Sequence, residues 1–539
     1  MSPSLRRLSV LVLLIAVLCG SAFASAYNAR PKVVVVIVVD QLRGDLLERY
    51  HDELPEGGFR LLMDGGAWFS NCNYQYANTR TGPGHATIGS GAYTLGHGII
   101  VNDWYDASKK RRVASVDDET TTVLGANISG SGASPRRMLT DTVGDELRMA
   151  TQGRARVYGV SLKDRSAILP TGYAANGAFW IDHKTGDFIT SSYYMKQAPD
   201  WLTAFNASGH VKRYLDREWK DAEGKTIRTT APQANPDGRP MDVYNRLGNT
   251  PFANDYTIDF ARELFLQEKL GTGPSTDLLI VSFSAPDVLG HNVGPDSPEH
   301  RAMLFALDRQ LADFFSFMGK QIGLANVVVA LTADHGIAPV AKQVELLHIP
   351  AEHIKPDALR AQLNATISAR LNRPADYITS LEYPLFYLSE AAFTAAGMKE
   401  GEAERITGDA MMQAGMRGFY TKAQLAAGDV PATNDGHKYL NSYSPYGGWW
   451  VFGVQPPFFT GAKTVETDHA SIYSYDTHVP LAFWGIPFKA GNYREATEPV
   501  DLAVTLSSLL GINAPAHSVG RVLNKAFADN PVTPKEGRR

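Results

Sequence analysis

Residues 32–40 read Lys-Val-Val-Val-Val-Ile-Val-Val-Asp, an unbroken run of apolar, β-branched side chains that ends in a carboxylate. Such runs are typical of a strand that is buried on both faces, as in a parallel sheet covered by helices. In open α/β sheets, ligands bind beyond the carboxyl ends of the strands. Asp40 is therefore either a helix cap or a residue of a binding site at that edge.

Two further apolar runs, residues 277–284 and 326–331, also lead into polar motifs. The first is followed by Asp287 and His291, whose spacing of four can place both side chains on one face of a helical turn. The second is followed by Asp334 and His335. His469 lies ahead of another apolar stretch, at residues 479–484. These residues and Asp40 would bring three carboxylates and three imidazoles to one sheet edge.

This set of ligands predicts a metal site. Carboxylate and imidazole ligands suit zinc, with manganese or iron as rivals. Six ligands are enough for two ions roughly 4 Å apart, the spacing that serves phosphoryl transfer. Cysteine does not compete, because the chain has two cysteines and Cys19 falls in the predicted leader. Only Cys72 then remains, so no disulfide can form within one mature chain.

Residues 78–89, Asn-Thr-Arg-Thr-Gly-Pro-Gly-His-Ala-Thr-Ile-Gly, predict a sharp turn that leads into a helix. Glycines allow the turn, and Pro83 favours a first helical turn. Thr81 would then lie at a helix N-terminus, where unpaired N–H groups suit an anion such as phosphate. A threonine hydroxyl needs a base or a metal before it can act as a nucleophile. Alone, the stretch could equally be an ordinary turn.

The composition bounds the class of protein. The chain has 539 residues, 44% of them hydrophobic, and a formal net charge of -4. The chain therefore lacks the excess of Lys and Arg that is typical of nucleic-acid-binding proteins. Residues 1–26 resemble a secretory signal, with Arg6 and Arg7 before an apolar run and a small-residue cleavage site at 24–26. We expect a periplasmic or secreted protein with no stable membrane association after cleavage.

The rest of the chain predicts one catalytic unit with insertions. Residues 27–530 would form that unit. Residues 170–255 are rich in Gly, Asn, Pro and aromatic side chains and have weak periodicity, so we interpret them as an inserted cap. Residues 340–460 are interpreted as a second insertion, and the tail at 531–539 is expected to be disordered. The sequence leaves the oligomeric state open, and we favour a monomer.

Together these motifs resemble the alkaline phosphatase superfamily, over about residues 32–512. More narrowly, they are similar to bacterial periplasmic alkaline phosphatases with a threonine nucleophile, which are related to nucleotide pyrophosphatase/phosphodiesterases. The resemblance implies an α/β fold with a doubly wound, mostly parallel sheet and inserted regions. It also implies zinc-dependent hydrolysis of small phosphate monoesters through a phospho-threonine intermediate, with some phosphodiesterase activity.

The resemblance assigns roles residue by residue. One zinc ion would bind Thr81, the nucleophile, with Asp40, Asp334 and His335. The second would bind Asp287, His291 and His469. The non-bridging phosphate oxygens would be held by Asn102, Lys163 and Arg165. This chain departs from the family pattern at one position. The last histidine ligand is often followed by Gly in the family, but here Ala470 follows His469. His478 is therefore a rival for the last ligand.

Three alternatives remain. Sulfatases share the fold, but this chain lacks their Cys or Ser followed by x-Pro-x-Arg. A phosphodiesterase or nucleotide pyrophosphatase of the same superfamily is the nearest rival, because it also uses threonine but lacks the Lys-x-Arg pair. The third alternative is a non-catalytic protein that binds zinc or phosphate. Release of phosphate from an aryl ester would exclude it.

Overall fold

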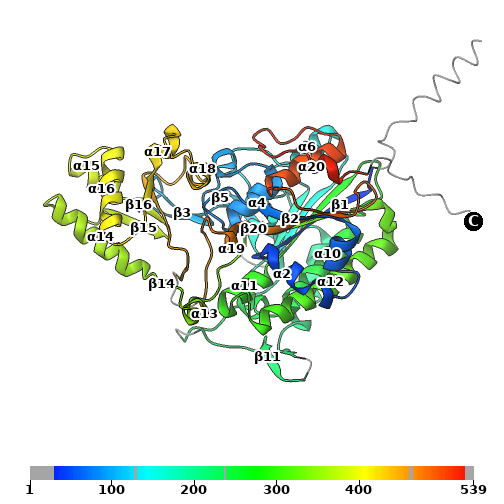
Figure 1. The fold of residues 1–539 in the computed structure, drawn as a ribbon. Helices are drawn as coiled ribbons and strands as arrows, with labels where there is room; N and C mark the ends of the chain where they lie inside the picture. Colours follow the sequence, from blue (N-terminus) through cyan, green and yellow to red (C-terminus); the bar gives the residue numbers. More distant parts are fainter. Residues whose placement is uncertain (1–29, 127–129, 222, 236–237, 461–464, 529–539) are drawn as a thin grey trace, which may run out of the picture.

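The computed structural model describes residues 30–126, 130–221, 223–235, 238–460 and 465–528. The predicted leader and the predicted disordered tail lie outside the described residues. The main sheet contains 11 strands among the described residues, and a layer of helices lies on each side of it (Figure 1). Its strand order is β21 (Gly491–Tyr493), β2 (Ala67–Asn73), β20 (His478–Trp484), β13 (Val327–Thr332), β1 (Val33–Val39), β12 (Asp277–Phe283), β7 (Val157–Ser161), β8 (Gly177–Ile181), β9 (Phe188–Ser191), β5 (Asp117–Leu124) and β6 (Ser131–Ala133).

The centre of the sheet is parallel. Strand β1 pairs in parallel with β12 on one side and with β13 on the other, so that Val33 aligns with both Asp277 and Val327. Every side chain of β1 is at most 1% exposed, as its β-branched run predicts. Strands β7 and β8 continue the parallel order beyond β12. The pairs β13–β20, β20–β2, β8–β9, β9–β5 and β5–β6 are antiparallel, so the sheet is mixed at both flanks.

Helices cover both faces of this sheet. One layer contains α4 (Thr81–Ser90), α6 (Val143–Ala150) and α20 (Val500–Leu510). The other contains α10 (Phe252–Gln267), α11 (Ala285–Val293) and α12 (Pro298–Ile322). Figure 1 shows α6 and α20 above the sheet and α10 and α12 below it. This arrangement confirms the predicted doubly wound α/β fold.

Residues 170–255 contribute to the main sheet as well as to its surroundings. Strands β8 and β9 lie in this range and extend the sheet beyond β7. The sequence alone predicts an insertion outside the core over this whole range, because strands of four or five residues are too short to show a clear period. Their aromatic residues pack on α10, as in the stacked pair Phe188–Phe260 at 3.7 Å. The division of the chain into domains stays a prediction.

A second, smaller sheet lies at one end of the molecule (Figure 1). It has four strands in the order β15 (Ile378–Glu382), β16 (Leu385–Leu388), β18 (Trp450–Gly453) and β17 (Phe419–Thr421). Helices α14 (Pro356–Arg370) and α16 (Glu400–Gln413) pack on it around a separate hydrophobic cluster. This part of the chain thus has its own core beside the sheet that carries the predicted site.

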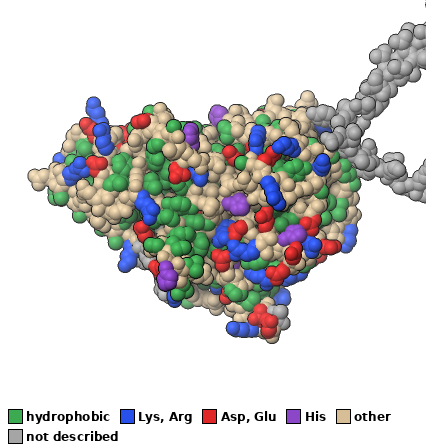
Figure 2. Space-filling view, in the orientation of Figure 1, with side chains coloured by type: hydrophobic (Ala, Val, Ile, Leu, Met, Phe, Trp, Pro, Cys, Tyr) green, Lys and Arg blue, Asp and Glu red, His purple; other side chains and the backbone are tan. Residues whose placement is uncertain are grey.

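The surface is mixed in charge. On the face shown in Figure 2, Lys and Arg side chains are interspersed with Asp and Glu. Among the described residues, no helix combines the length and apolar character needed to cross a membrane. Cys72 is fully buried in β2 and forms no disulfide.

Candidate active site

The three predicted aspartates lie together at the carboxyl edge of the central strands. Asp40 directly follows β1, Asp334 follows β13 by two residues, and Asp287 lies in the first turn of α11, just beyond β12. Asp40 and Asp334 are fully buried, and Asp287 is 5% exposed. The parallel register therefore brings carboxylates from distant parts of the chain to one place, as the sequence predicts.

Helix α4 presents Thr81 to this edge. The helix begins at Thr81, so the threonine lies at the end where backbone N–H groups are unpaired. His85 fixes the helix, because its Nδ1 lies 2.9 Å from the Thr81 carbonyl oxygen and 3.2 Å from Asp334 Oδ2. Gly84 permits the close approach, since a Cβ there would lie 2.3 Å from the Asp334 carbonyl oxygen. The glycine after Pro83 thus lets the helix touch the end of β13.

Three histidines share one hydrogen-bonding pattern. The Nδ1 atoms of His291, His335 and His469 lie 3.0, 2.8 and 2.7 Å from the backbone carbonyl oxygens of Thr467, Gly336 and Thr79. A carbonyl oxygen only accepts, so each Nδ1 carries the proton and donates it. In its neutral form, each imidazole therefore presents the Nε2 lone pair toward the carboxylates. This tautomer is the one a histidine needs when it binds a metal through Nε2.

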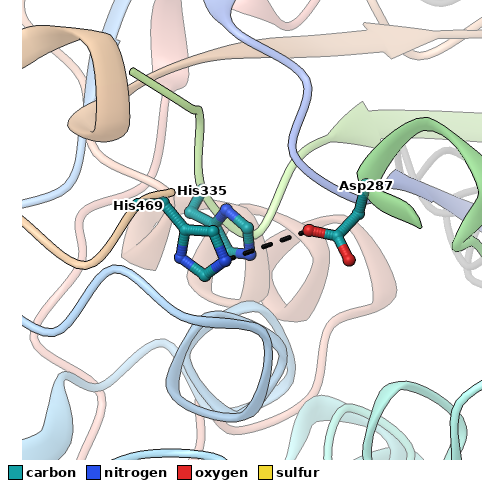
Figure 3. A group of neighbouring side chains, drawn as sticks. All are labelled: Asp287, His335 and His469. Atoms are coloured by element: carbon teal, nitrogen blue, oxygen red, sulfur yellow. Dashed lines mark ion pairs between the residues drawn. The ribbon is translucent and has the colours of Figure 1, made fainter. Parts of the chain in front are cut away.

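The side chains form overlapping groups that could hold metal ions. Figure 3 shows one of them, in which the His469 ring stacks on His335 at 3.8 Å and its Nε2 lies 3.9 Å from Asp287 Oδ1. Within each group the ligand atoms lie within 4.8 Å of one another. Among the described residues, the groups are Asp40–Asp334–His335, Asp287–His335–His469 and His291–Asp468–His469.

The buried polar atoms of the first group fit a metal. Asp40 Oδ1 and His335 Nε2 are buried and make no hydrogen bond among the described residues, and Asp334 Oδ2 has only the 3.2 Å contact with His85 and a longer one with His335. An unpaired buried carboxylate oxygen is costly, and a bound cation would offset that cost. Two carboxylates and one imidazole are also the donor types that zinc takes. We conclude that this group fits a divalent ion.

Lys163 contacts two of the predicted metal ligands, and its role at the phosphate stays a prediction. Its Nζ lies 2.6 Å from Asp40 Oδ2 and 2.5 Å from Asp287 Oδ2, so it bridges two of the predicted ligands. Burial and the neighbouring carboxylates raise the pKa of Asp40 well above its ordinary value. Burial also acts to raise the pKa of Asp287, but Lys163 and His291 outweigh it and hold that pKa well below its usual range. Lys163 thus offsets negative charge at the site.

The histidines differ in their protonation. Burial lowers the pKa of His335 and of His469, which favours their neutral, ligand-competent form. Burial acts in the same direction on His291, but the Asp287 carboxylate outweighs it and raises the pKa of His291 to about 9. The Nε2 atom of His291 lies 3.2 Å from Asp287 Oδ1. A metal bound at His291 would therefore compete with a proton.

A cavity of about 850 Å³ opens over these groups and is lined by Thr81, Asn102, Lys163, Arg165 and Asp287. Asn102 Oδ1 accepts a hydrogen bond of 2.7 Å from the Gly82 N–H. Arg165 lies at the start of α7 (Asp164–Ile168), and its Nη1 is 3.6 Å from Asp164 Oδ1. The three predicted phosphate ligands thus line the same cavity as the predicted nucleophile.

The structure favours His469 over His478 as the last histidine of the site. His478 Nε2 lies 3.0 Å from the Ser70 carbonyl oxygen, so this nitrogen donates a hydrogen bond. His478 belongs to none of the groups of ligands found among the described residues. The His469 side chain, in contrast, lies beside Asp287 and His335.

Sequence reasoning missed two residues of the site. Asp468 belongs to the group with His291 and His469. The sequence motif that could have indicated it is the Asp-His pair at residues 468–469, which also occurs at Asp334–His335. Gln41 donates from Nε2 to Asp287 Oδ1 at 2.7 Å and from its backbone N–H to Asp334 Oδ1 at 3.1 Å. No local pattern marks a glutamine for this role.

Comparison with known proteins identifies the family. Residues 34–399 match the model of the family described as type I phosphodiesterase / nucleotide pyrophosphatase. The chain belongs to this family. It is 32% identical over 525 residues to alkaline phosphatase PhoV of Synechococcus elongatus, covering 92% of each chain. It is 30% identical to alkaline phosphatase PafA of Elizabethkingia meningoseptica, covering 95% of this chain and 97% of PafA.

The crystal structure of wild-type PafA has the same fold. It superposes with a TM-score of 0.84 at 29% identity, covering 93% of this chain and 99% of PafA. A PafA variant, with a threonine, an asparagine, a lysine and an arginine substituted, gives the same TM-score at 28% identity. These matches confirm the predicted superfamily, the α/β fold and an enzyme of the phosphatase class.

Proposed function

We propose that this enzyme hydrolyses small phosphate monoesters, with Thr81 as the nucleophile and two zinc ions as cofactors. One observation carries the proposal: Thr81 begins a helix beside groups that comprise seven carboxylate and imidazole side chains, in a cavity that Asn102 and Arg165 also line. A helix N-terminus and a guanidinium both favour a phosphoryl group. The PafA variant supports the assignment, since its substituted residues are of the same four types as Thr81, Asn102, Lys163 and Arg165.

The proposed reaction has two steps. Thr81 Oγ1 attacks phosphorus, the bond from phosphorus to the ester oxygen breaks, and the leaving alcohol takes up a proton. Water then attacks the phospho-threonine, which releases inorganic phosphate and restores the hydroxyl. When bound, divalent ions at such a site lower the pKa of attacking oxygens and offset charge on the leaving oxygen.

This chain's own residues would orient the phosphoryl group. One ion would be held by Asp40, Asp334 and His335 together with Thr81. The other would be held by Asp287, His291 and His469. Asn102 would hold a phosphate oxygen through Nδ2, because its Oδ1 already accepts from Gly82. Arg165 would hold another through its guanidinium, and its Nε is buried without a partner among the described residues.

A phosphodiesterase is the second candidate, because the matching family model is that of type I phosphodiesterases. The two functions differ in the charge of the substrate. A monoester dianion has one more charged oxygen than a diester, and Arg165 and Lys163 can bind it. We also propose that the protein is exported to the periplasm, on the basis of the leader predicted at residues 1–26.

The experiment that separates the two functions compares an aryl phosphate with its methyl diester. A charge-assisted hydrogen bond contributes roughly 1.5–3 kcal/mol, so Arg165→Ala should lower kcat/KM for the monoester by about one to two decades. The diester should lose much less. Equal losses on both substrates would contradict the monoesterase assignment.

Lys163→Ala serves as the second variant, with metal content measured in parallel. If Lys163 binds phosphate, the variant should lose monoester activity and keep its metals. If it acts through Asp40 and Asp287, which it contacts here, its metal content should change as well. A parent enzyme that prefers the diester would favour the second candidate.

A further inference from the structure

The cavity over Thr81 has room for more than a phosphoryl group. Its volume of about 850 Å³ lies within the range of sites that enclose a whole small molecule. A second cavity of about 270 Å³ adjoins it and shares Arg228, Met241, Asn245 and Asn249 in its lining. The leaving group of a substrate would therefore lie against this side, which we call the outer wall and define as the cavity-lining residues between 226 and 249.

Arg228 is held in the outer wall by a β-hairpin. It lies on β11 (Thr226–Thr229), directly opposite Trp219 on β10 (Glu218–Lys220). Opposite residues of an antiparallel pair project from the same face. Trp219 is 8% exposed and packs in the main hydrophobic core, so Arg228 also projects toward the body of the protein.

The base of the hairpin is fixed by hydrogen bonds around Thr230. Its hydroxyl donates to the Tyr214 carbonyl oxygen at 2.8 Å and accepts from the Arg217 N–H at 3.0 Å. Its carbonyl oxygen accepts from two nitrogens of Arg246, at 2.8 and 2.5 Å. Arg228 is thus two residues away from a well-anchored point, and its position does not depend on a free loop.

Arg228 differs from the other arginines around the cavity in having no partner. Arg80 pairs with Glu382 at 3.3 Å, and Arg165 pairs with Asp164 at 3.6 Å. The Arg228 side chain makes no hydrogen bond and no ion pair with any residue that the structure describes, and its Nε is buried. Burial lowers the pKa of Arg228 and outweighs the charge of Glu299, which acts in the opposite direction. A half-buried guanidinium without a counter-ion is costly, and a bound anion offsets that cost.

We propose that Arg228 binds a second anionic group, a phosphate or a carboxylate, on the leaving group of the substrate. The enzyme would then prefer phosphate monoesters that carry negative charge at both ends. This inference rests on the proposed monoesterase function and defines its substrate class. The nearby Asn249 amide carries no charge and is already engaged, because it donates to the Asn245 carbonyl oxygen and accepts from Asn292.

The test uses matched substrates of increasing chain length. Alkanediol bisphosphates and ω-carboxyalkyl phosphates carry a second anion, whereas ω-hydroxyalkyl phosphates do not. We consider the chain length at which the second anion reaches Arg228. At this length we expect kcat/KM to be at least tenfold higher for an anionic substrate than for its hydroxyl analogue. A charge-assisted hydrogen bond contributes roughly 1.5–3 kcal/mol, and about 1.4 kcal/mol corresponds to a factor of ten. The bisphosphate and carboxylate arms identify which anion is favoured.

Three variants establish that the preference comes from Arg228. Arg228→Gln should remove it and leave hydrolysis of the hydroxyl analogue within about twofold of the parent, because that substrate has no group for Arg228 to bind. Arg228→Lys should restore part of it. Lys225→Gln is the matched control, because Lys225 is exposed just before β11 and does not line either cavity. The absence of any preference, or equal losses on both substrates, would overturn the proposal.

Failure of the proposed function would look different. A parent enzyme that hydrolyses none of these monoesters would reject the monoesterase assignment, whatever Arg228 does. Calorimetric titration of the metal-loaded parent and Arg228→Gln with an alkane bisphosphonate then tests the subsite independently of turnover. Weaker binding to the variant would support the subsite, and equal or absent binding would exclude it.

Discussion

The floor of the site, which we define as Asp40, Thr81, Asp287, Asp334 and His335, is held by the ends of buried strands and by the first turns of α4 and α11. Of these residues, Thr81 and Asp287 line the cavity itself. The outer wall is held by a two-stranded hairpin and by α9 (Val243–Gly248). Residues of the floor are at most 5% exposed, whereas Arg228, Asn245 and Asn249 are all partly exposed. The register of the main sheet thus determines the positions of the floor residues, whereas a peripheral part of the structure determines those of the outer wall.

This difference separates chemistry from selectivity. Register errors in the floor would displace several ligands at once, because each strand end supplies one or two of them. A change in the wall alters the contacts of the leaving group and leaves the strand ends in place. Such a division is common in enzymes, whose loops and peripheral elements carry specificity on a rigid scaffold. We therefore expect large effects on turnover from the floor and substrate-dependent effects from the wall.

The largest expected effect is that of removing the metals. Chelation should reduce activity to background and zinc should restore it, because Asp40 Oδ1 and His335 Nε2 are buried and make no hydrogen bond among the described residues. Metal analysis and thermal unfolding should accompany the activity assay, since an ion that binds only the folded state raises Tm. Full turnover and an unchanged Tm in metal-free protein would contradict a metal site in the floor.

Much of the floor could be predicted from the sequence, and the wall could not. The run at residues 33–39 and the motifs Asp287-x3-His291 and Asp334-His335 are local signals, and the fold brings them together as expected. Arg228 has no such signal, because its importance comes from the partners it lacks in three dimensions. Strands β8 and β9 were missed for a related reason, since their short runs are recognised as strands only through the pairing of β8 with β7 and of β9 with β8.

The next effect concerns the nucleophile. Thr81→Ala should lower kcat by on the order of a thousandfold or more, because it removes the attacking oxygen. Metal content should remain near that of the parent, since Asp40, Asp334 and His335 are unchanged. Thr81→Ser is the matched control, because it keeps a hydroxyl, and it should retain measurable turnover. Trapping at low pH should label Thr81 in the parent, and a label on Thr79 or Thr87 would assign the nucleophile to another residue.

The smallest effect tests how rigidly the floor is held. Gln41 links its two halves, because its Nε2 donates to Asp287 and its backbone N–H donates to Asp334. It adopts a left-handed backbone conformation, with φ of 69°, directly after Asp40. Gly290 makes room for it, since a Cβ there would lie 2.1 Å from Gln41 Oε1. These contacts make Gln41 a positioning residue that fixes the orientation of the Asp287 carboxylate.

Gln41→Met keeps the length of the side chain and removes its amide, so the hydrogen bond to Asp287 is lost while the backbone N–H can still donate to Asp334. Loss of a hydrogen bond that orients a metal ligand costs about tenfold to a hundredfold in metal affinity, so zinc should bind more weakly by about that factor. Competition with a chromophoric chelator measures the affinity directly, without turnover. At saturating zinc, kcat should return to near the parent value, because Thr81, Asn102 and Arg165 are unchanged. If Gln41 only supports the fold, Tm would fall while zinc affinity stayed the same, and that result would remove the link between the two halves of the floor.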